Sequence, residues 1–285
     1  MSLLYRRALS ALRALDGGSS VPPGAQGALD WTFTLARWLL EQQSGPHPAH
    51  RIAASGSPTP FPRPPKDLAP EFLVAGAGTV VGLLRRPQDQ NGIVDDAVTL
   101  VAPLFDTSTQ IASACAIGGF LAALLDGWAM EGAMAQSLFV TRRGEAFGKE
   151  KGPSVARALE EAWSAVSAGE GADFEQALSS VGSLDGQVTR SIFLVSRAVG
   201  LAFVYRDVGE VLARASGFGP DAPYVGAVAA MLSAAYAPES LPENLSAEVE
   251  ERTDLLELLE MLLELRTSRY QTVFAYASRF RRKKC

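Results

Sequence analysis

Hydrophobic residues recur every three or four positions along almost the whole chain. In the first segment they fall at Leu4, Ala8, Leu12 and Leu15, and this spacing is that of one face of an α-helix. Strict alternation, which is typical of a half-buried strand, is rare; residues 79–84 come nearest and fit a helix equally well. The pattern therefore predicts an all-α protein. Further helices are expected at about 31–41, 94–104, 107–126, 129–140, 153–168, 173–182, 187–204, 207–216, 224–236, 248–266 and 268–281.

Glycine and proline mark the breaks between these helices. The longest break, 45–66, is rich in proline, and proline in a helix interior both removes a hydrogen bond and clashes with the preceding turn. Several helices are rich in small residues, which allow helix backbones to approach closely. We expect one domain of crossing helices, an orthogonal multi-helix fold, over residues 1–266, with 45–66 as a proline-rich loop. Residues 267–285 are expected to form a C-terminal helix and a basic tail.

The amino-acid composition and the net charge argue against some classes of function. The 285 residues are 47% hydrophobic and 20% charged, with a net charge of −5, which is ordinary for a globular protein. Nucleic-acid binding requires clustered Lys and Arg to neutralise phosphates. The basic cluster of this chain lies at its very end, 279–285, where we expect a solvated tail. The sequence therefore predicts no nucleic-acid partner.

Cysteines and apolar segments bear on the location of the protein. Cys115 lies in an apolar run and Cys285 is the last residue; this spacing is not that of a disulfide framework or a zinc site. The N-terminal segment lacks the pattern of a signal peptide. The apolar run Ile111–Leu125 is shorter than the roughly 20 residues that a membrane helix needs, so we expect a buried core helix. The predictions are a cytoplasmic protein without a membrane partner.

Candidate catalytic groups are few. Both histidines, His47 and His50, lie in the proline-rich loop, so a histidine-based catalytic centre is not expected. Gly76 and Gly78 lack the preceding strand of a nucleotide-binding loop. Carboxylates stand near several expected helix starts, where a capping side chain accepts a hydrogen bond from a backbone N–H. We expect caps at Asp30, Asp106 and Asp221, and a turn residue at Asp16.

Four stretches resemble the ADP-ribosylglycohydrolase family. The first two are "YRRALSALRALDGG" and "ALDWTFTLARWLLEQ" near the N-terminus. The third runs from "AGAGTVVGLL" to "IGGFLAALLDG" in the middle of the chain, and the last is "GFGPDAPYVGAVAAMLSAAYAPESLPENL", 217–245. Together they span roughly residues 3–265. The resemblance implies an all-α single-domain fold and a cleft at the starts of the second and the late small-residue helix.

The resemblance also implies a site for two magnesium ions, held by two acidic motifs at those helix starts. Without gaps, the first motif, Thr-Asp-Asp-Thr, falls on residues 26–29, which are Gln, Gly, Ala and Leu. The second, Asp-Thr-Asp-Thr, falls on Pro220, Asp221, Ala222 and Pro223. Magnesium requires oxygen ligands in octahedral geometry, and these positions no longer supply them. No metal site and no bound cofactor are therefore expected.

Other positions of the family pattern are kept in part. Its aspartate near the end of the first helix matches Asp16, and its Thr-His turn becomes Phe105-Asp106. We predict a protein that has kept the fold, has lost the dimetal centre and is catalytically inactive, binding an ADP-ribose-like molecule or a protein. Two alternatives stay open: a hydrolase of an ADP-ribosyl or related glycosidic bond with an unusual acidic site, and a scaffold with a filled cleft. Catalytic residues are not assigned; the candidate ligand-binding residues are Asp16, Asp30, Trp31, Asp106 and Asp221, with Trp31 as the side chain expected to fill the cleft.

Overall fold

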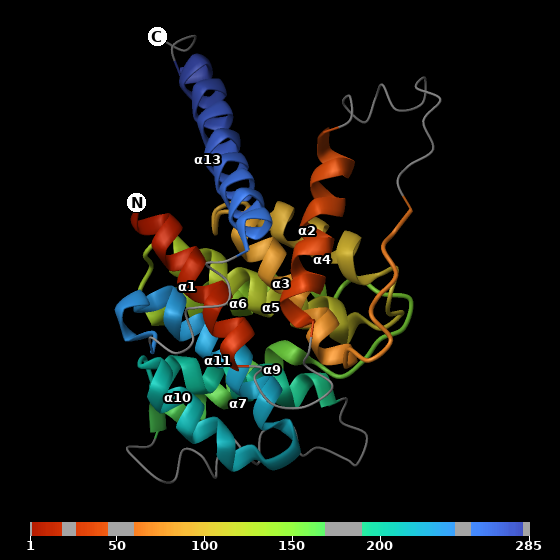
Figure 1. The fold of residues 1–285 in the computed structure, drawn as a ribbon. Helices are drawn as coiled ribbons and strands as arrows, with labels where there is room; N and C mark the ends of the chain where they lie inside the picture. Colours follow the sequence, from red (N-terminus) through yellow and green to blue (C-terminus); the bar gives the residue numbers. More distant parts are fainter. Residues whose placement is uncertain (1, 19–26, 45–59, 169–189, 243–251, 282–285) are drawn as a thin grey trace.

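The structure is a computed structural model that describes residues 2–18, 27–44, 60–168, 190–242 and 252–281. These residues form helices joined by short loops, with no β-strand among them beyond an isolated bridge between Thr107 and Glu150. The predicted all-α fold is confirmed (Figure 1). The α-helices among the described residues are α1 (Leu3–Gly18), α2 (Ala28–Ser44), α3 (Pro70–Leu84), α4 (Gln90–Val101), α5 (Ser108–Leu125), α6 (Met130–Gly144), α7 (Val155–Ala168), α9 (Arg190–Val204), α10 (Val208–Ala215), α11 (Ala222–Tyr236) and α13 (Thr253–Arg281).

Most predicted helices agree with these bounds. Residues 79–84, which fitted either a strand or a helix, lie within α3. The helix expected at 173–182 lies outside the described residues, as do His47 and His50. The described part of the proline-rich loop, 60–66, contains no helix, as predicted.

One predicted boundary is wrong. The sequence indicated separate helices at 248–266 and 268–281, but α13 runs without a break from Thr253 to Arg281. The apolar pattern is interrupted at Arg266, yet the Arg266 side chain is buried with only 2% of its surface exposed. The next residue, Thr267, donates its hydroxyl proton to the Leu263 carbonyl oxygen at 2.8 Å, which is compatible with a continuing helix. A polar residue on the buried face therefore interrupted the pattern without interrupting the helix.

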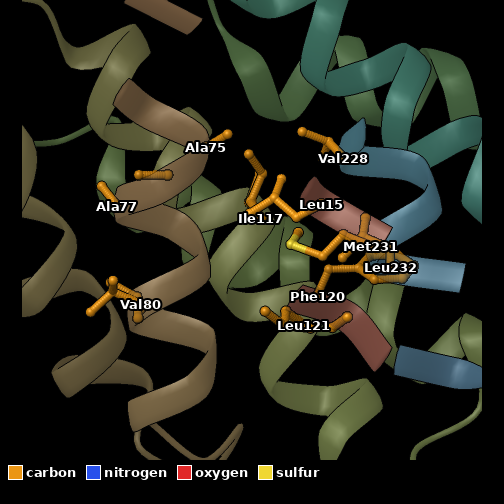
Figure 2. Close-up of a cluster of buried hydrophobic side chains, with 14 of the residues drawn as sticks. Leu15, Ala75, Ala77, Val80, Ile117, Phe120, Leu121, Val228, Met231 and Leu232 are labelled. Carbon is orange, nitrogen blue, oxygen red and sulfur yellow. The ribbon is translucent and has the colours of Figure 1, made fainter. Parts of the chain in front are cut away.

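The core is built around α3 and α5. Glycines let these two helices touch: a Cβ atom at Gly78 would lie 2.8 Å from Cβ of Ile117, and one at Gly118 would lie 3.1 Å from the Gly78 carbonyl oxygen. A Cβ atom at Gly78 would also lie 2.9 Å from the Ala114 carbonyl oxygen, so any side chain there forces the two helices to shift. Figure 2 shows the apolar cluster in which α1, α3, α5 and α11 meet. Its labelled members are Leu15, Ala75, Ala77, Val80, Ile117, Phe120, Leu121, Val228, Met231 and Leu232.

Helix α5 is the element of the described residues that is long and apolar enough to cross a membrane by length and composition. In this fold 94% of its 18-residue window is buried inside the protein. A buried core helix passes the same test, and the burial of α5 is that of a core helix. The sequence-based expectation of a buried core helix at Ile111–Leu125 is therefore confirmed.

Helix α13 is fixed to the body through Arg266. The Arg266 guanidinium donates to the carbonyl oxygens of Gly82 at 2.7 Å and Ala122 at 2.9 Å, near the ends of α3 and α5, and to Asp126 at 2.7 Å. It therefore joins the C-terminal ends of two core helices to α13. Beyond this anchor, the second half of α13 extends away from the body, as Figure 1 shows.

Candidate functional site

The start of α11 corresponds to the second acidic motif of the family resemblance. A short 3₁₀ helix, Ser216–Asp221, leads directly into α11. Asp221 occupies the position before the first helical residue, but its side chain accepts no capping hydrogen bond. The predicted cap is therefore wrong. Asp221 has helical dihedral angles, φ −91° and ψ −12°, whereas a capping side chain normally sits on an extended residue.

The Asp221 carboxylate instead faces two arginines of α9. Arg190 approaches it at 2.8 Å and Arg197 at 3.7 Å. Arg197 also lies over the rings of Phe193 and Phe218, with its guanidinium carbon 4.9 Å and 5.1 Å from the ring centres. Burial lowers the pKa of Arg197, and the charge of Asp221 acts in the opposite direction. The start of α11 is thus a cluster of two cations and one anion.

The start of α2 corresponds to the first acidic motif. Helix α2 begins at Ala28, so Asp30 lies in its first turn and is not the cap that the sequence predicted. An acidic residue in the first turn interacts favourably with the helix dipole. The side chain of Asp30 is 61% exposed and pairs with Arg252 at 2.9 Å, just before α13. Gly27, before the helix, has a φ of 89°, and this left-handed conformation disfavours an aspartate at the position that the family motif would assign it.

The side chain of Trp31, the residue after Asp30, is packed inside the protein. Its side chain is buried, with 1% of its surface exposed, and its ring lies against Gly76 of α3, where a Cβ atom would come within 3.0 Å of Cδ1. The indole Nε1 has no hydrogen-bond partner among the residues that the structure describes. The ring is therefore part of the packing between α2 and α3.

The remaining candidate carboxylates lie apart from these two. Asp106 precedes α5, and Thr107 rather than Asp106 occupies the capping position, so this predicted cap is also wrong. The exposed Asp106 side chain accepts a hydrogen bond from Lys149 at 2.6 Å. Asp16 was expected in a turn after the first helix, but α1 continues to Gly18, which places Asp16 inside its last turn. Its side chain lies outside the described part of the structure.

These contacts do not assemble a site for two magnesium ions. Asp30, Asp106 and Asp221 each pair with a different cation on a different segment. Within the described residues, no group of three or more Asp, Glu, His or Cys side chains is close enough to hold a metal ion. Two divalent ions need several carboxylates to offset their charge. At the start of α11 the single carboxylate is already matched by two guanidinium groups, so the residues present do not fit the dimetal centre.

Grooves lined by described residues lie elsewhere on the surface, and three of them are well defined. The first, about 490 Å³, lies between α6 and α7 beside Phe139 and Trp163. The second, about 380 Å³, lies between α2 and α13, and the third, about 660 Å³, lies between α1 and α13. None of these three grooves is lined by Asp30, Trp31, Asp106 or Asp221. The candidate ligand-binding residues and the grooves are therefore separate features of this surface.

The described residues define an all-α protein with a central α3–α5 pair and with two arginines of α9 set against the start of α11. The sequence model of the ADP-ribosylglycohydrolase family matches residues 26–272, and the chain belongs to this family. Comparisons with curated proteins and with solved structures found no significant match. The resemblance inferred from the sequence is thereby confirmed.

The sequence analysis missed the arginines. Arg190, Arg197 and Arg252 complete the environments of Asp221 and Asp30, and Arg266 anchors α13. Arg197 gave a usable signal, because it stands within the apolar helix "RSIFLVSRAVGLAFV". A lone cation in such a segment indicates either a buried ion pair or a side chain that covers apolar surface. Its partner could not be read from the sequence.

Proposed function

We propose that this chain is a member of the ADP-ribosylglycohydrolase family that has lost metal-dependent hydrolysis and binds an anionic ligand at the start of α11. One observation carries the proposal: Asp221, the carboxylate nearest the family's second acidic motif, is held by Arg190 and Arg197. Two guanidinium groups already neutralise this carboxylate, so it offers little to a divalent cation. Arg190, whose side chain is 58% exposed, can still meet an anion.

The local geometry supports an anion in two further ways. The N-terminus of α11 carries the positive end of the helix dipole. Arg190 has 58% of its side chain exposed and is accessible to a ligand, whereas Arg197 is 13% exposed and is held between two aromatic rings. Pro223, within the first turn, removes one backbone donor. The cluster therefore depends on its arginines more than on its backbone amides.

ADP-ribose is the first ligand to test, because arginine forms charge-assisted, often bidentate hydrogen bonds with phosphate groups such as those of its diphosphate. We expect weak binding, with a dissociation constant of about 1 mM or somewhat below, which corresponds to roughly −4 kcal/mol. Binding should be independent of magnesium and should weaken as salt is added, because salt screens exposed charges. Isothermal titration calorimetry with and without magnesium measures both properties.

The variant Asp221→Asn separates the proposed function from the hydrolase alternative. Removing this carboxylate removes repulsion of a phosphate, so we expect ADP-ribose to bind about fivefold more tightly, or about 1 kcal/mol better. A site in which Asp221 binds metal or acts in hydrolysis would instead be weakened or inactivated by the same change. Arg197→Met should weaken binding, and Glu161→Gln, in an exposed Arg157–Glu161 pair on α7, is the matched control.

Two results would contradict the proposal in different ways. Magnesium binding at micromolar affinity together with release of ADP-ribose from a modified protein would establish an active hydrolase. If neither ADP-ribose nor inorganic phosphate binds, the proposed anion site does not exist, and the helical-scaffold alternative is favoured. The scaffold candidate is also compatible with the burial of Trp31, whose ring packs between α2 and α3.

A further inference from the structure

The groove of about 380 Å³ between α2 and α13 has an apolar floor that is open to solvent. Leu40 of α2 and Leu258 of α13 line it, and each is buried with 5% of its surface exposed. Met261 lines the same groove and is 52% exposed, which is high for a large apolar side chain. Methionine adapts its shape to different neighbours and is common on surfaces that bind partners. The groove therefore offers apolar contact area to a molecule outside this chain.

The walls of this groove are two helices, which rise from the same side of the body in Figure 1. Each wall is one helix face, because the lining positions are spaced by one, three or four residues: 37, 40 and 41 on α2, and 254, 257, 258 and 261 on α13. The α13 positions extend over about 10 Å at 1.5 Å per residue. A groove between two helices is the shape that a third helix fills. An extended peptide would instead need a sheet edge to pair with, and the described residues form no strand.

The edges of the groove are predominantly acidic. Among the lining residues, Asp254 is matched by Arg252 at 3.5 Å, and Arg37 supplies a cation. The exposed carboxylates in and beside the groove that form no ion pair with another described residue are Glu41, Glu257, Glu260 and Glu264. Four carboxylates thus face one guanidinium that is likewise unpaired within the described part of the chain. A partner with Lys or Arg beside its apolar residues complements this distribution of charge.

We infer that the α2–α13 groove docks a basic amphipathic helix of a partner protein. The apolar face of that helix packs on Leu40, Leu258 and Met261, and its flanking Lys or Arg side chains meet Glu41 and Glu257. A second copy of this chain bound through the same face would bring these carboxylates together, since a two-fold interface sets equal surfaces against each other. An anionic membrane would be repelled by them. The groove is separate from the start of α11, so the inference does not rest on the proposed function.

The experiment uses the full chain and a labelled synthetic peptide of about 14 residues, in which Leu follows the spacing of one helix face and Lys fills the other positions. Fluorescence anisotropy at low salt should give saturable binding with a dissociation constant below about 100 μM, and binding should weaken as salt is raised. Two altered peptides separate the contributions. Replacing Leu by Ser keeps the charge, and replacing Lys by Glu keeps the apolar face. Each should bind at least about tenfold more weakly.

Variants of the protein locate the peptide in the groove. Met261→Gln keeps the length of the side chain and removes its apolar end, so it should raise the dissociation constant at least about fivefold. Glu41→Gln combined with Glu257→Gln should have an effect of similar size and should also reduce the dependence on salt. All three side chains are exposed, so the fold should be kept, which circular dichroism and thermal unfolding verify.

Two controls match these changes elsewhere on the surface. Phe139→Gln alters another exposed apolar side chain, 45% exposed on α6. Glu131→Gln combined with Glu210→Gln removes the same amount of charge from exposed residues of α6 and α10. Both controls should leave the dissociation constant of the peptide unchanged within about twofold.

Several outcomes would overturn the inference. If the wild-type chain shows no saturable binding of the peptide below about 100 μM at low salt, the groove is not a docking site for a basic helix. If the Glu131 and Glu210 control weakens binding as much as the Glu41 and Glu257 pair, the peptide follows only the net charge. If Met261→Gln has no effect, the apolar groove is not used. Light scattering that shows a dimer of the free protein, dissociated by Met261→Gln, would assign the groove to a second copy instead.

Discussion

Replacing Arg266 with methionine tests the anchor that joins α13 to the ends of α3 and α5. Methionine has a similar length but no charge and no donor. Burial lowers the pKa of the Arg266 guanidinium, while the charge of Asp126 opposes this effect. The guanidinium nevertheless stays ionised at neutral pH, because the ordinary pKa of arginine is above 12. The substitution therefore removes a buried, hydrogen-bonded charge.

The magnitude follows from the groups left behind. Asp126 keeps a partner in Arg86 at 2.9 Å, and the Ala122 carbonyl oxygen keeps the Asp126 backbone N–H at 3.3 Å. The Gly82 carbonyl oxygen loses its donor at 2.7 Å. Each buried carbonyl left without a partner costs about 1–3 kcal/mol. Removing one member of a buried ion pair costs about 3–5 kcal/mol where the other charge is left unpaired, and here Asp126 is still paired with Arg86. We therefore expect Arg266→Met to lower the free energy of unfolding by about 2–4 kcal/mol.

Urea denaturation followed by circular dichroism measures this change as a shift of the midpoint at constant slope. In a thermal scan the loss corresponds to a fall of Tm of about 10 °C for a chain of this size. Arg142→Met is the matched control, because Arg142 pairs with Glu160 on the surface, where their side chains are 63% and 42% exposed. Such a pair contributes at most about 1 kcal/mol. If Arg266→Met costs no more than Arg142→Met, the anchor as described is wrong.

Two further predictions concern the core. Burial raises the pKa of the Cys115 thiol to about 12, so in a Cys285→Ser protein no thiol should react with a disulfide reagent at pH 8 until the chain is unfolded; reaction of the native protein would contradict the burial. The ordinary pKa of this thiol is 9.0, and only the protonated form fits the buried site. Its contribution to stability is therefore complete below pH 9 and is lost as the pH rises towards 12. Cys115→Ala should remove this loss from unfolding curves measured at alkaline pH. Gly78→Ala should cost about 1–3 kcal/mol in urea denaturation because its Cβ would overlap Ile117. Gly217→Ala, where a Cβ would meet nothing within 4 Å, should change stability little, and equal effects of the two substitutions would refute the close α3–α5 contact.

Most of the fold could be predicted from the sequence, because each buried helix face produces a regular spacing of apolar residues within a short segment. The spacing of Leu4, Ala8, Leu12 and Leu15 reflects burial of one face of α1, and all of the last three are buried. The run that includes Ile111–Leu125 is apolar on every side, which is consistent with the burial of α5 on every side. The error at Arg266 has the opposite cause: a buried cation looks like a surface residue until its carbonyl partners are known.

The candidate site was accessible only in outline. The family resemblance located the two helix starts, and the loss of their acidic motifs was visible in Gly27, Ala28, Pro220 and Ala222. The roles assigned to the surviving aspartates as caps were wrong, because a cap depends on the dihedral angles of its own residue and on competing partners. Asp221 has helical dihedral angles and an arginine at 2.8 Å, and neither fact has a signature in the neighbouring sequence.

The sequence by itself determined the helical class, the family and the absence of the family's acidic motifs at the aligned positions. Each of these depends on residues that are close together along the chain. Tertiary structure alone decided which charges meet. Arg190 and Asp221 are 31 positions apart, and Arg266 meets the Gly82 carbonyl oxygen across 184 positions. The physical reason is that hydrogen bonds and ion pairs depend on distances of a few ångströms in space. Those distances are set by how the helices pack, through contacts such as the one between Gly78 and Ile117.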